Sequence, residues 1–444
     1  MNNPFIIHDS MENKISFYHL AFFLLLLPFD RIYSELVLIS FVLHTLFHIT
    51  KERARYIPSR HNLILFSVFF IGVIGMLWSH DREQGVKDLQ RQLGLLLLPI
   101  ALSATGLDLK KYKKNLLLLF GFSCSVVILY LYIDAFRIIL YNKLPLKTIF
   151  SPVFINHNFS DPIGIHATYL AMYIALSLAA YFYYISMEKR YWLKWAYAIF
   201  IAIMLAGLVQ SASRSVLIAM AVFALIFPFF LMNREKKLRW ILGVIGLSVI
   251  AFVGITRIDA FQKRYVTTLK EDLLIESINN KQPESRAYRW EQALQLSYAS
   301  PLVGYGTGSE KRLLKERYFE KKLYRSYLLQ LNAHNQYISF LLKTGIIGLL
   351  VFLSVLIMGF ITAWRTRDAI FSCFMLLITI VSVSENILDV NKGIFFYAFF
   401  FSLFNQGFAG FKGLKKRSRE NAAIDLKTYL QASKPFDQSK RLVK

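Results

Sequence analysis

The chain has 444 residues, of which 55% are hydrophobic, and its mean hydropathy is +0.43. Soluble proteins have an apolar share nearer ~45–50%, so this composition excludes an ordinary soluble enzyme. The apolar residues come in blocks, many of them close to the roughly 20 residues that a helix needs to cross a bilayer. The chain is therefore predicted to be an all-α, polytopic membrane protein.

The formal net charge of +24 would also fit a nucleic-acid-binding protein. In a membrane protein, however, the first question is which loops carry the lysines and arginines. Here they gather in every second loop, and this accounts for most of the charge without nucleic acid. The two cysteines, Cys124 and Cys373, lie inside apolar blocks without a partner at metal-ligand spacing, so they predict neither a disulfide framework nor a metal site.

Twelve apolar segments are predicted to be membrane-spanning helices, because only helices and closed barrels satisfy their backbone within lipid. The first lacks a small-residue cleavage site and is expected to be a retained span. The fourth opens with Gln90, Arg91 and Gln92 and is the least apolar at its start. The predicted spans are 15–29, 34–50, 62–79, 90–105, 115–134, 164–186, 191–209, 215–232, 239–256, 334–361, 369–386 and 392–410.

The loops between these spans alternate in charge, and this alternation predicts the orientation of the chain. One set, which includes KERARYIPSR (51–60) and NREKKLR (233–239), is rich in Lys and Arg, whereas the short loops between them are poor in both. The positive-inside rule places the rich set and both termini in the cytoplasm. The basic tail, residues 411–444, is expected to be a solvated cytoplasmic end near anionic lipid.

The outward segment between the ninth and tenth spans, residues 257–333, is 77 residues long, far beyond the usual length of a connection. It carries 14 Lys+Arg against 9 Asp+Glu, a net charge of +5, which favours an anionic ligand. It is predicted to be a loop domain between spans 1–9 (residues 1–256) and spans 10–12 (residues 334–410). Helices are predicted over 260–278, 285–298 and 309–327, with the glycine-rich turn SPLVGYGTGS before the last.

His334 stands in LNAHNQYISFLLKTG, where this loop re-enters the bilayer. A histidine at a membrane edge often does no more than hydrogen-bond the backbone. Imidazole nevertheless titrates near ~6.5, so it is well suited to take a proton from a hydroxyl at neutral pH. Because no other histidine has this setting, His334 is a candidate general base, with the adjacent Asn335 as a candidate substrate-binding residue.

Two arginines on the outward side are candidate anion ligands. Arg214 lies in SASRSVLIAM, where the positive-inside rule disfavours a cation, after small polar residues. Arg286 and Trp290 are four residues apart in ESRAYRWEQAL and share a helix face, with Arg289 as the competing arginine. A planar guanidinium suits phosphate oxygens, and for either arginine the simpler alternative is an exposed charge at the outer surface.

Several other polar residues have a structural and a functional interpretation. His166 and Tyr169 face the outer mouth of span 164–186 and could bind sugar hydroxyls, whereas Asp161 could simply cap that helix. Asp81 with Glu83, and Glu385 with Asp389, could bind a divalent metal or act as bases, but solvated loop charges are the plainer interpretation. The sequence contains no phosphate-binding glycine loop and no HExxH metal motif.

The ordered set SASRSV, SRAYRW, SPLVGYGTGS and HNQYISFLLKTGIIGLL, with IHATYLA before it, resembles the O-antigen ligase and polymerase family of bacterial inner-membrane glycosyltransferases. The resemblance covers most of the chain and is strongest over residues 160–350. It implies a metal-independent transfer outside the inner membrane, without a cofactor, from a glycan on undecaprenyl pyrophosphate to a glycan acceptor, which in the ligases is a lipid A-core sugar. By this resemblance His334 is the catalytic histidine, and Arg214 and Arg286 are the catalytic arginines.

Three functions remain open at this stage. The first is the ligase, and the second is a polymerase or a protein glycosyltransferase of the same family, because acceptor choice lies in poorly patterned loops. The third is a transporter with an anion path lined by Arg91, Arg214 and Arg286. Transporters tend to show paired repeats and broken helices near the midplane, whereas here the polar residues gather at the outer rim.

Overall fold

The computed structural model describes residues 7–29, 31–273 and 284–405. These residues form helices and loops without a β-strand, so the predicted all-α class is confirmed for this part of the chain. The basic tail predicted over residues 411–444 lies outside the described residues.

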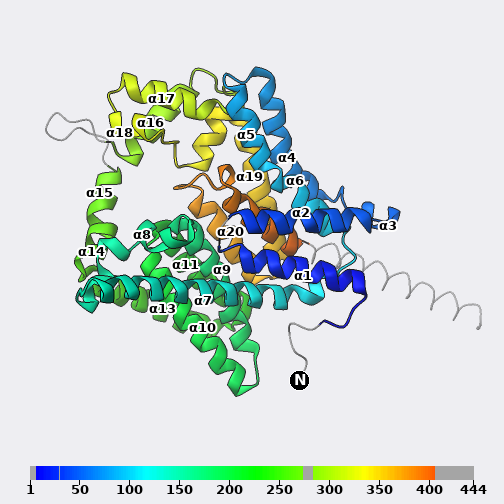
Figure 1. Cartoon of the computed structure of the whole chain (residues 1–444), viewed down its shortest axis with the longest axis vertical. Coiled ribbons are helices and arrows are strands. Elements are labelled where there is room, and N and C mark those ends of the chain that lie inside the picture. Colours follow the sequence, from blue (N-terminus) through cyan, green and yellow to red (C-terminus); the bar gives the residue numbers. More distant parts are fainter. Residues whose placement is uncertain (1–6, 30, 274–283, 406–444) are drawn as a thin grey trace, which may run out of the picture.

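Helices of very different length succeed one another along the chain (Figure 1). Up to the middle of the sequence they are α1 (Met11–Leu26), α2 (Arg31–Phe47), α3 (Lys51–Ala54), α4 (Arg60–Gly75), α5 (Arg82–Gln92), α6 (Gly94–Ala104), α7 (Leu109–Tyr141), α8 (His157–Ser160), α9 (Ala167–Met187), α10 (Tyr191–Ser211) and α11 (Arg214–Ile226). They continue as α12 (Pro228–Leu231), α13 (Arg234–Thr256), α14 (Asp259–Gln262), α15 (Thr268–Leu273), α16 (Arg286–Ser297), α17 (Ser309–Glu320), α18 (Tyr324–Leu328), α19 (Gln336–Thr366) and α20 (Ala369–Val381), and residues 391–405 are also helical.

The described residues also include five short 3-10 helices and one short π-helix. The 3-10 helices are η1 (Met76–Trp78), η2 (Leu146–Phe150), η3 (Pro152–Phe154), η4 (Asp161–Ile163) and η6 (Ile387–Asp389), and the π-helix is η5 (Lys263–Thr267). Short polar side chains fix where several helices begin, because they accept the free backbone N–H groups of the first turn. The capping residues include Ser59 of α4, Asp81 of α5, Asp108 of α7 and Asp368 of α20.

Within the described residues, five helical segments are long and apolar enough to cross a bilayer: Arg60–Trp78, Leu109–Tyr141, Ala167–Met187, Tyr191–Ser211 and Gln336–Thr366. Three further apolar helices are shorter, at Ile32–Phe47, Arg214–Phe230 and Ala369–Val381. Each of the twelve predicted spans contains helix in the part of the chain that the structure describes. The number of twelve, and the orientation of the chain, nevertheless stay predictions.

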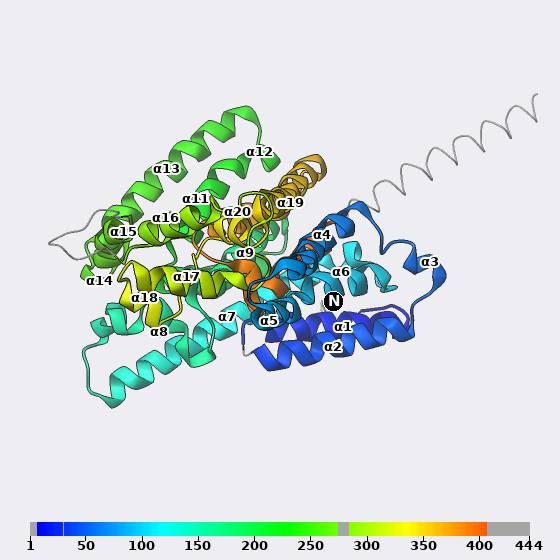
Figure 2. The ribbon, with the colours of Figure 1, turned by 90° about the horizontal axis from the view of Figure 1, so that it is seen from above.

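The core lies around α9, which packs against α7, α10 and α20 and is the most buried of the five long apolar helices (Figures 1 and 2). Tyr173 of α9 stands at its centre, with its ring 5.6 Å from that of Phe120 and 5.0 Å from that of Phe396. Lipid is as apolar as these side chains, so close packing, not the hydrophobic effect, holds such helices together. Each aromatic pair adds about 0.5–1.5 kcal/mol to this packing.

The glycine-rich turn connects the loop domain to a break in α19. Gly345 interrupts the helix with φ 64° and ψ −163°. The turn fills the break, because the N–H of Tyr305 donates to the carbonyl of Leu342 at 3.0 Å and the N–H of Ile346 donates to that of Pro301 at 2.8 Å. The turn predicted from the glycines is therefore a structural joint, and the break that it fills lies about three helical turns from His334.

The structure corrects several predicted helix ends. The helix predicted over 309–327 is divided in two, since the backbone turns at Lys322 (φ 58°) between α17 and α18. The helix predicted over 260–278 is followed to Leu273, with its remainder outside the described residues. Asp161 does not cap α9, which begins at Ala167 without a side-chain cap. The start of the predicted span 90–105 belongs to α5, and the apolar helix begins at Gly94.

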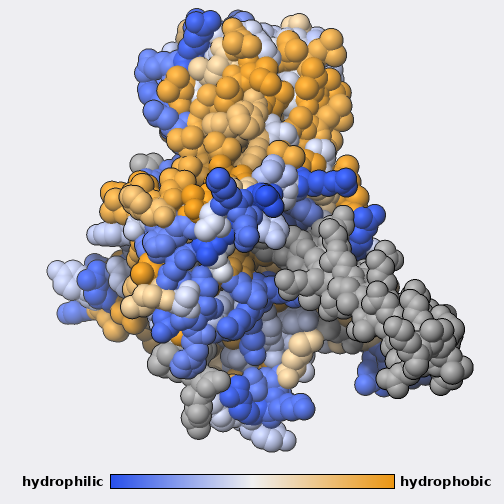
Figure 3. All heavy atoms as spheres, turned by 90° about the vertical axis from the view of Figure 1, so that its right-hand side faces the viewer, coloured by the Kyte–Doolittle hydropathy of each residue, from blue (hydrophilic) through white to orange (hydrophobic). Residues whose placement is uncertain are grey.

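The basic loop 51–60 includes α3, which lies at the right-hand edge of Figure 1. Figure 3 faces that side and shows hydrophilic residues across the middle and lower part of the face, with hydrophobic residues above them. The positive-inside rule predicts that this side faces the cytoplasm.

Candidate functional site

His334 lies in a tight turn that side chains of α16 and α17 hold in place through hydrogen bonds. Its backbone is left-handed (φ 48°), which few residues other than glycine adopt. Its own N–H donates to Asn332 Oδ1 at 3.1 Å. The residue before it, Ala333, donates its N–H to Glu310 and accepts from the indole of Trp290, at 3.0 and 2.8 Å. These contacts fix the direction in which the imidazole ring points.

The imidazole of His334 faces a carboxylate that is distant in the sequence. Nδ1 of His334 lies 3.4 Å from Oε2 of Glu385, whose side chain is buried while that of His334 is 25% exposed. A carboxylate accepts hydrogen bonds, so this contact favours the tautomer with the proton on Nδ1. Nε2 then carries the free lone pair, and within the described residues no hydrogen bond to Nε2 is formed. The pair is therefore arranged for proton abstraction at Nε2.

Glu385 lies just beyond the end of α20, in the segment that leads to η6. Burial by itself raises the pKa of its carboxyl group, but the hydrogen bond with His334 and the electrostatic effect of nearby groups, including the Arg286 cation, lower it, and the net result is a pKa below the ordinary value. Glu385 is thus ionised at neutral pH and able to accept the hydrogen bond from Nδ1 of His334.

Three arginines from three elements meet around one carboxylate. Arg214 of α11 contacts Asp272 of α15, and Nε of Arg286 in α16 lies 4.0 Å from the same Asp272 oxygen. Arg264 of η5 donates to the carbonyl of Ala212 at 3.4 Å. Burial lowers the pKa of Arg264, and the charges of Arg214 and Arg286 lower it further. Three guanidinium groups and one carboxylate leave two positive charges at this cluster.

The arginine cluster, which we define as Arg214, Arg264 and Arg286, has unused capacity for an anion. Nη1 of Arg214 is buried and makes no hydrogen bond with a described residue. Arg214 and Arg286 also occupy the first positions of α11 and α16, where the helix dipole opposes a cation and favours an anion. A ligand with several negative charges, such as a pyrophosphate, would accept a hydrogen bond from Nη1 of Arg214. It would also offset the unfavourable placement of two cations at helix N-termini.

One segment of the chain connects the arginine cluster to the histidine. Arg286 donates through Nη1 to the carbonyl of Ser384 at 3.2 Å, and the next residue is Glu385, the partner of His334. Asn386 follows and donates through Nδ2 to Asp389 at 2.9 Å. The anion-binding groups and the candidate base are therefore neighbours along residues 384–389.

His166 and Tyr169, at the start of α9, lie beside this segment. The Tyr169 hydroxyl donates to the carbonyl of Asn386 at 3.3 Å, so it positions the segment. The ring of His166 lies 4.0 Å from that of His157, and its Nδ1 is buried without a hydrogen-bond partner among the described residues. Burial, more than any neighbouring charge, lowers the pKa of both histidines, that of His157 to about 4.

The remaining predicted site residues have structural contacts that the sequence did not indicate. Asn335 caps α19, because its Oδ1 accepts the N–H groups of Tyr337 and Ile338. Trp290 holds the His334 turn through Ala333. Arg289 is buried beside Tyr318 and, among the described residues, forms no ion pair with Asp272; its Nε and Nη1 lack a described partner, and burial lowers its pKa. Whether any of these binds substrate stays a prediction.

Arg91, Asp81 and Glu83 belong to α5 and its cap, apart from the arginine cluster. Arg91 pairs with Asp88 at 3.0 Å, Asp81 caps the helix, and Glu83 pairs with Lys87 on the surface. The plainer interpretation of Asp81 and Glu83, as ordinary loop charges, accounts for these contacts.

Sequence reasoning missed three parts of the site. Glu385 was treated as a solvated charge, because its contact with His334 spans 51 positions and leaves no local signal. Arg264 and Asp272 stand in a charged helix that resembles any solvated helix. Lys343 did have a signal, since a lysine within an apolar span needs a counterion; it pairs with Asp389 at 2.8 Å and lies 3.6 Å from Glu310.

Comparison with known families gives one match. Residues 199–353, from α10 to the first half of α19, match the family described as O-antigen ligase. This segment contains Arg214, Arg286 and His334, whereas Glu385 and His166 lie outside it. No curated protein matches the chain. This segment of the chain is therefore similar to the O-antigen ligase family, and the similarity covers about a third of the sequence.

Proposed function

We propose that the protein transfers a glycan from undecaprenyl pyrophosphate to a hydroxyl of lipid A-core, at the periplasmic face of the bacterial inner membrane. The observation that carries this proposal is the placement of the His334–Glu385 pair beside the arginine cluster. An anion site next to a positioned base is what a pyrophosphate leaving group and an acceptor hydroxyl require.

On the donor side, the arginine cluster holds the pyrophosphate. The pyrophosphate takes the place of the Asp272 carboxylate, because it brings more negative charge and more oxygen atoms to the same guanidinium groups. As the bond to the sugar breaks, charge develops on the leaving oxygen, and fixed guanidinium groups stabilise it without reorganisation. The proposal needs no metal ion for this charge.

On the acceptor side, His334 removes one proton. The acceptor oxygen attacks the anomeric carbon of the donor sugar while its proton passes to Nε2 of His334. The bond from that carbon to the pyrophosphate oxygen breaks, and undecaprenyl pyrophosphate leaves with the electron pair. Attack opposite the leaving group inverts the anomeric centre, and Glu385 stabilises the imidazolium at Nδ1.

The alternatives in the same family use the same chemistry with another acceptor. A polymerase would pass the glycan to a second carrier-linked repeat, and a protein glycosyltransferase would pass it to a Ser or Thr hydroxyl. Proton removal by His334 is the same for any acceptor hydroxyl, so the acceptor must be determined by experiment.

The test uses the purified protein, a glycan on undecaprenyl pyrophosphate, and three acceptors in parallel: lipid A-core, a carrier-linked repeat, and a Ser/Thr-containing protein. We expect transfer to lipid A-core, undiminished in EDTA. Arg214→Ala and Arg286→Ala should each abolish it, and lysine should rescue poorly because the planar fork is lost. Arg289→Ala, in the same helix as Arg286, is the matched control and should be milder.

If the protein transfers the glycan only to one of the other acceptors, it is the corresponding polymerase or protein glycosyltransferase and not the ligase. Loss of transfer in EDTA, restored by magnesium, would contradict charge stabilisation by arginine alone. An essential Arg289 with a dispensable Arg286 would contradict the assignment within α16.

A further inference from the structure

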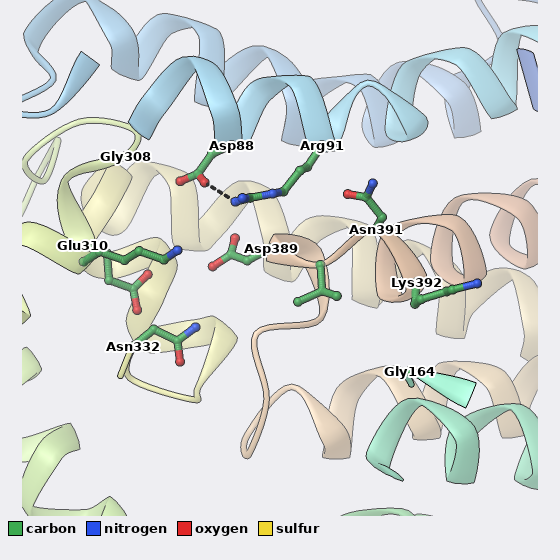
Figure 4. A pocket seen from close by; sticks show the side chains of 11 residues that line it. Asp88, Arg91, Gly164, Gly308, Glu310, Asn332, Asp389, Asn391 and Lys392 are labelled. Carbon is green, nitrogen blue, oxygen red and sulfur yellow. Dashed lines mark hydrogen bonds and ion pairs between the residues drawn. The ribbon is translucent and has the colours of Figure 1, made fainter. Parts of the chain in front are cut away.

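A polar cavity of about 380 Å³ is lined in part by Asp389, at the end of the segment 384–389. Figure 4 shows its walls, which come from α5, α17 and the turn before His334. The volume falls within the range of about 300–1,000 Å³ that is usual for small-molecule sites. Its lining includes Asp88, Arg91, Glu310, Asn332, Asp389 and Asn391.

The charges of this cavity differ from those of the arginine cluster. Its lining contains the carboxylates of Asp88, Glu310 and Asp389, of which Asp88 pairs with Arg91 and Asp389 with Lys343, whereas the cluster has an excess of two positive charges. The carboxylate and amide oxygens accept hydrogen bonds, which suits the many hydroxyl donors of a sugar. The cavity is therefore chemically suited to a polyhydroxylated ring and less to a pyrophosphate.

The cavity also lies within reach of the candidate base. Asn332 lines it, and the Oδ1 atom of the same residue accepts the backbone N–H of His334. Asp389 lines it and belongs, with Glu385, to the segment that faces His334.

A second hollow, of about 570 Å³, lies beside this cavity, because Arg91 and Asn391 line both. Its walls between α2 and α6 are apolar and consist of Leu38, Ile39, Val42, Leu43, Leu97 and Phe395, among others. Its polar lining, Glu35, Lys87 and Gln90, comes from the outward ends of α2 and α5 under the predicted orientation. We name this hollow the α2–α6 groove.

We propose that the α2–α6 groove and the polar cavity together bind a lipid-anchored glycan acceptor, with its apolar chain in the groove and its sugar in the cavity. This inference rests on the proposed function, and it names the acceptor as a glycolipid. The argument is that an apolar groove, between helices predicted to face lipid, lies next to a polar cavity whose lining includes Asn332, a hydrogen-bond partner of His334. The donor is held separately, at the arginine cluster.

Two leucines of α2 allow a matched test. Leu43 lines the groove and is 50% exposed, whereas Leu46 is 53% exposed and does not line it. Each is replaced by Trp, and transfer is measured with a lipid-linked acceptor and with the same acceptor after its lipid chains are removed. Hydrolysis of the donor in the absence of acceptor reports separately on the donor side.

We expect Leu43→Trp to raise the KM for the lipid-linked acceptor about tenfold, which corresponds to the loss of roughly two buried methylene groups. Donor hydrolysis and any use of the delipidated acceptor should stay unchanged, and Leu46→Trp should behave as wild type. In the wild type, the delipidated acceptor should be the poorer substrate.

The inference is overturned if Leu43→Trp leaves the lipid-linked acceptor unaffected, or if it weakens both acceptors alike. A defect in donor hydrolysis would instead assign the groove to the carrier lipid of the donor, and equal use of both acceptors by the wild type would also contradict it. Failure of the proposed function looks different, because Arg214→Ala and His334→Ala would then remain active with every acceptor.

Discussion

His334 shows how a single residue can keep an unfavourable backbone for the sake of its side chain. A left-handed conformation costs an ordinary residue about 1–2 kcal/mol. Here the hydrogen bonds from Asn332, Glu310 and Trp290 to residues 333 and 334 hold the turn in place. Strain of this kind persists where the surroundings over-determine it, and the result is an imidazole with Nδ1 toward Glu385 and Nε2 free.

At the residue scale, the neighbouring rings of His157 and His166 predict how stability depends on pH. Both pKa values are lowered, so both rings are neutral in the folded protein at neutral pH, whereas histidines of the unfolded chain bind protons near pH ~6.5. As the pH falls, the unfolded state therefore binds protons first, and stability declines from about pH 6.5 toward the folded-state value of about 4 for His157.

This dependence is measured as the Tm of the detergent-solubilised protein between pH 7.5 and pH 4.5. His157→Asn should flatten the decline, and Asn158→Ala, an exposed neighbour without a titratable group, should keep the wild-type slope. If His157→Asn and the wild type decline in parallel, the pair does not carry the effect.

At the scale of elements, the break in α19 couples the loop domain to the membrane helices. The N–H groups of Tyr305 and Gly306 satisfy the carbonyls of Leu342 and Lys343 where the helix is interrupted at Gly345. The same turn of α19 places Lys343 against Asp389 and Glu310, and Glu310 also holds the residue before His334. The geometry of the site therefore depends on this joint.

Gly345→Ala should destabilise the protein strongly. A Cβ at this position would lie 2.2 Å from the carbonyl of Leu302, and the left-handed backbone adds about 1–2 kcal/mol for a residue other than glycine. Gly243→Ala in α13 is the matched control, because nothing lies within 4 Å of its added Cβ. The measurement is the Tm of each variant together with its yield in the membrane fraction; equal behaviour of the two variants would contradict the account of the joint.

Helices could be predicted from the sequence more readily than contacts between residues distant in the sequence, for a physical reason. Long apolar runs are local properties, so the helices of the predicted spans could be read from the sequence, and so could the helix over 285–298, which Ser285 caps in the structure. Pairings such as His334 with Glu385 and Lys343 with Asp389 depend on how helices fold back on one another. The break between α17 and α18 was missed because no glycine or proline marks Lys322.

At the scale of the whole molecule, the account requires that the loop domain and the basic loops lie on opposite sides of the membrane. Cysteines placed at Glu320 in α17 and Lys236 in α13, both exposed, test this in a chain whose own Cys124 and Cys373 are buried. A membrane-impermeant thiol reagent added from outside should label the first position and not the second. Labelling of Lys236→Cys alone would invert the topology and remove the site from the periplasm.

The central claim is that His334 removes the acceptor proton while the arginine cluster binds the donor. The most direct measurement compares purified wild type, His334→Ala and Glu385→Gln in one assay that records both donor binding and the rate of glycan transfer. We predict unchanged donor binding in all three, a transfer rate lower by about 10²–10⁴ for His334→Ala, which is the usual contribution of a positioned base, and a smaller loss for Glu385→Gln. Full transfer activity of a folded His334→Ala variant would contradict the account.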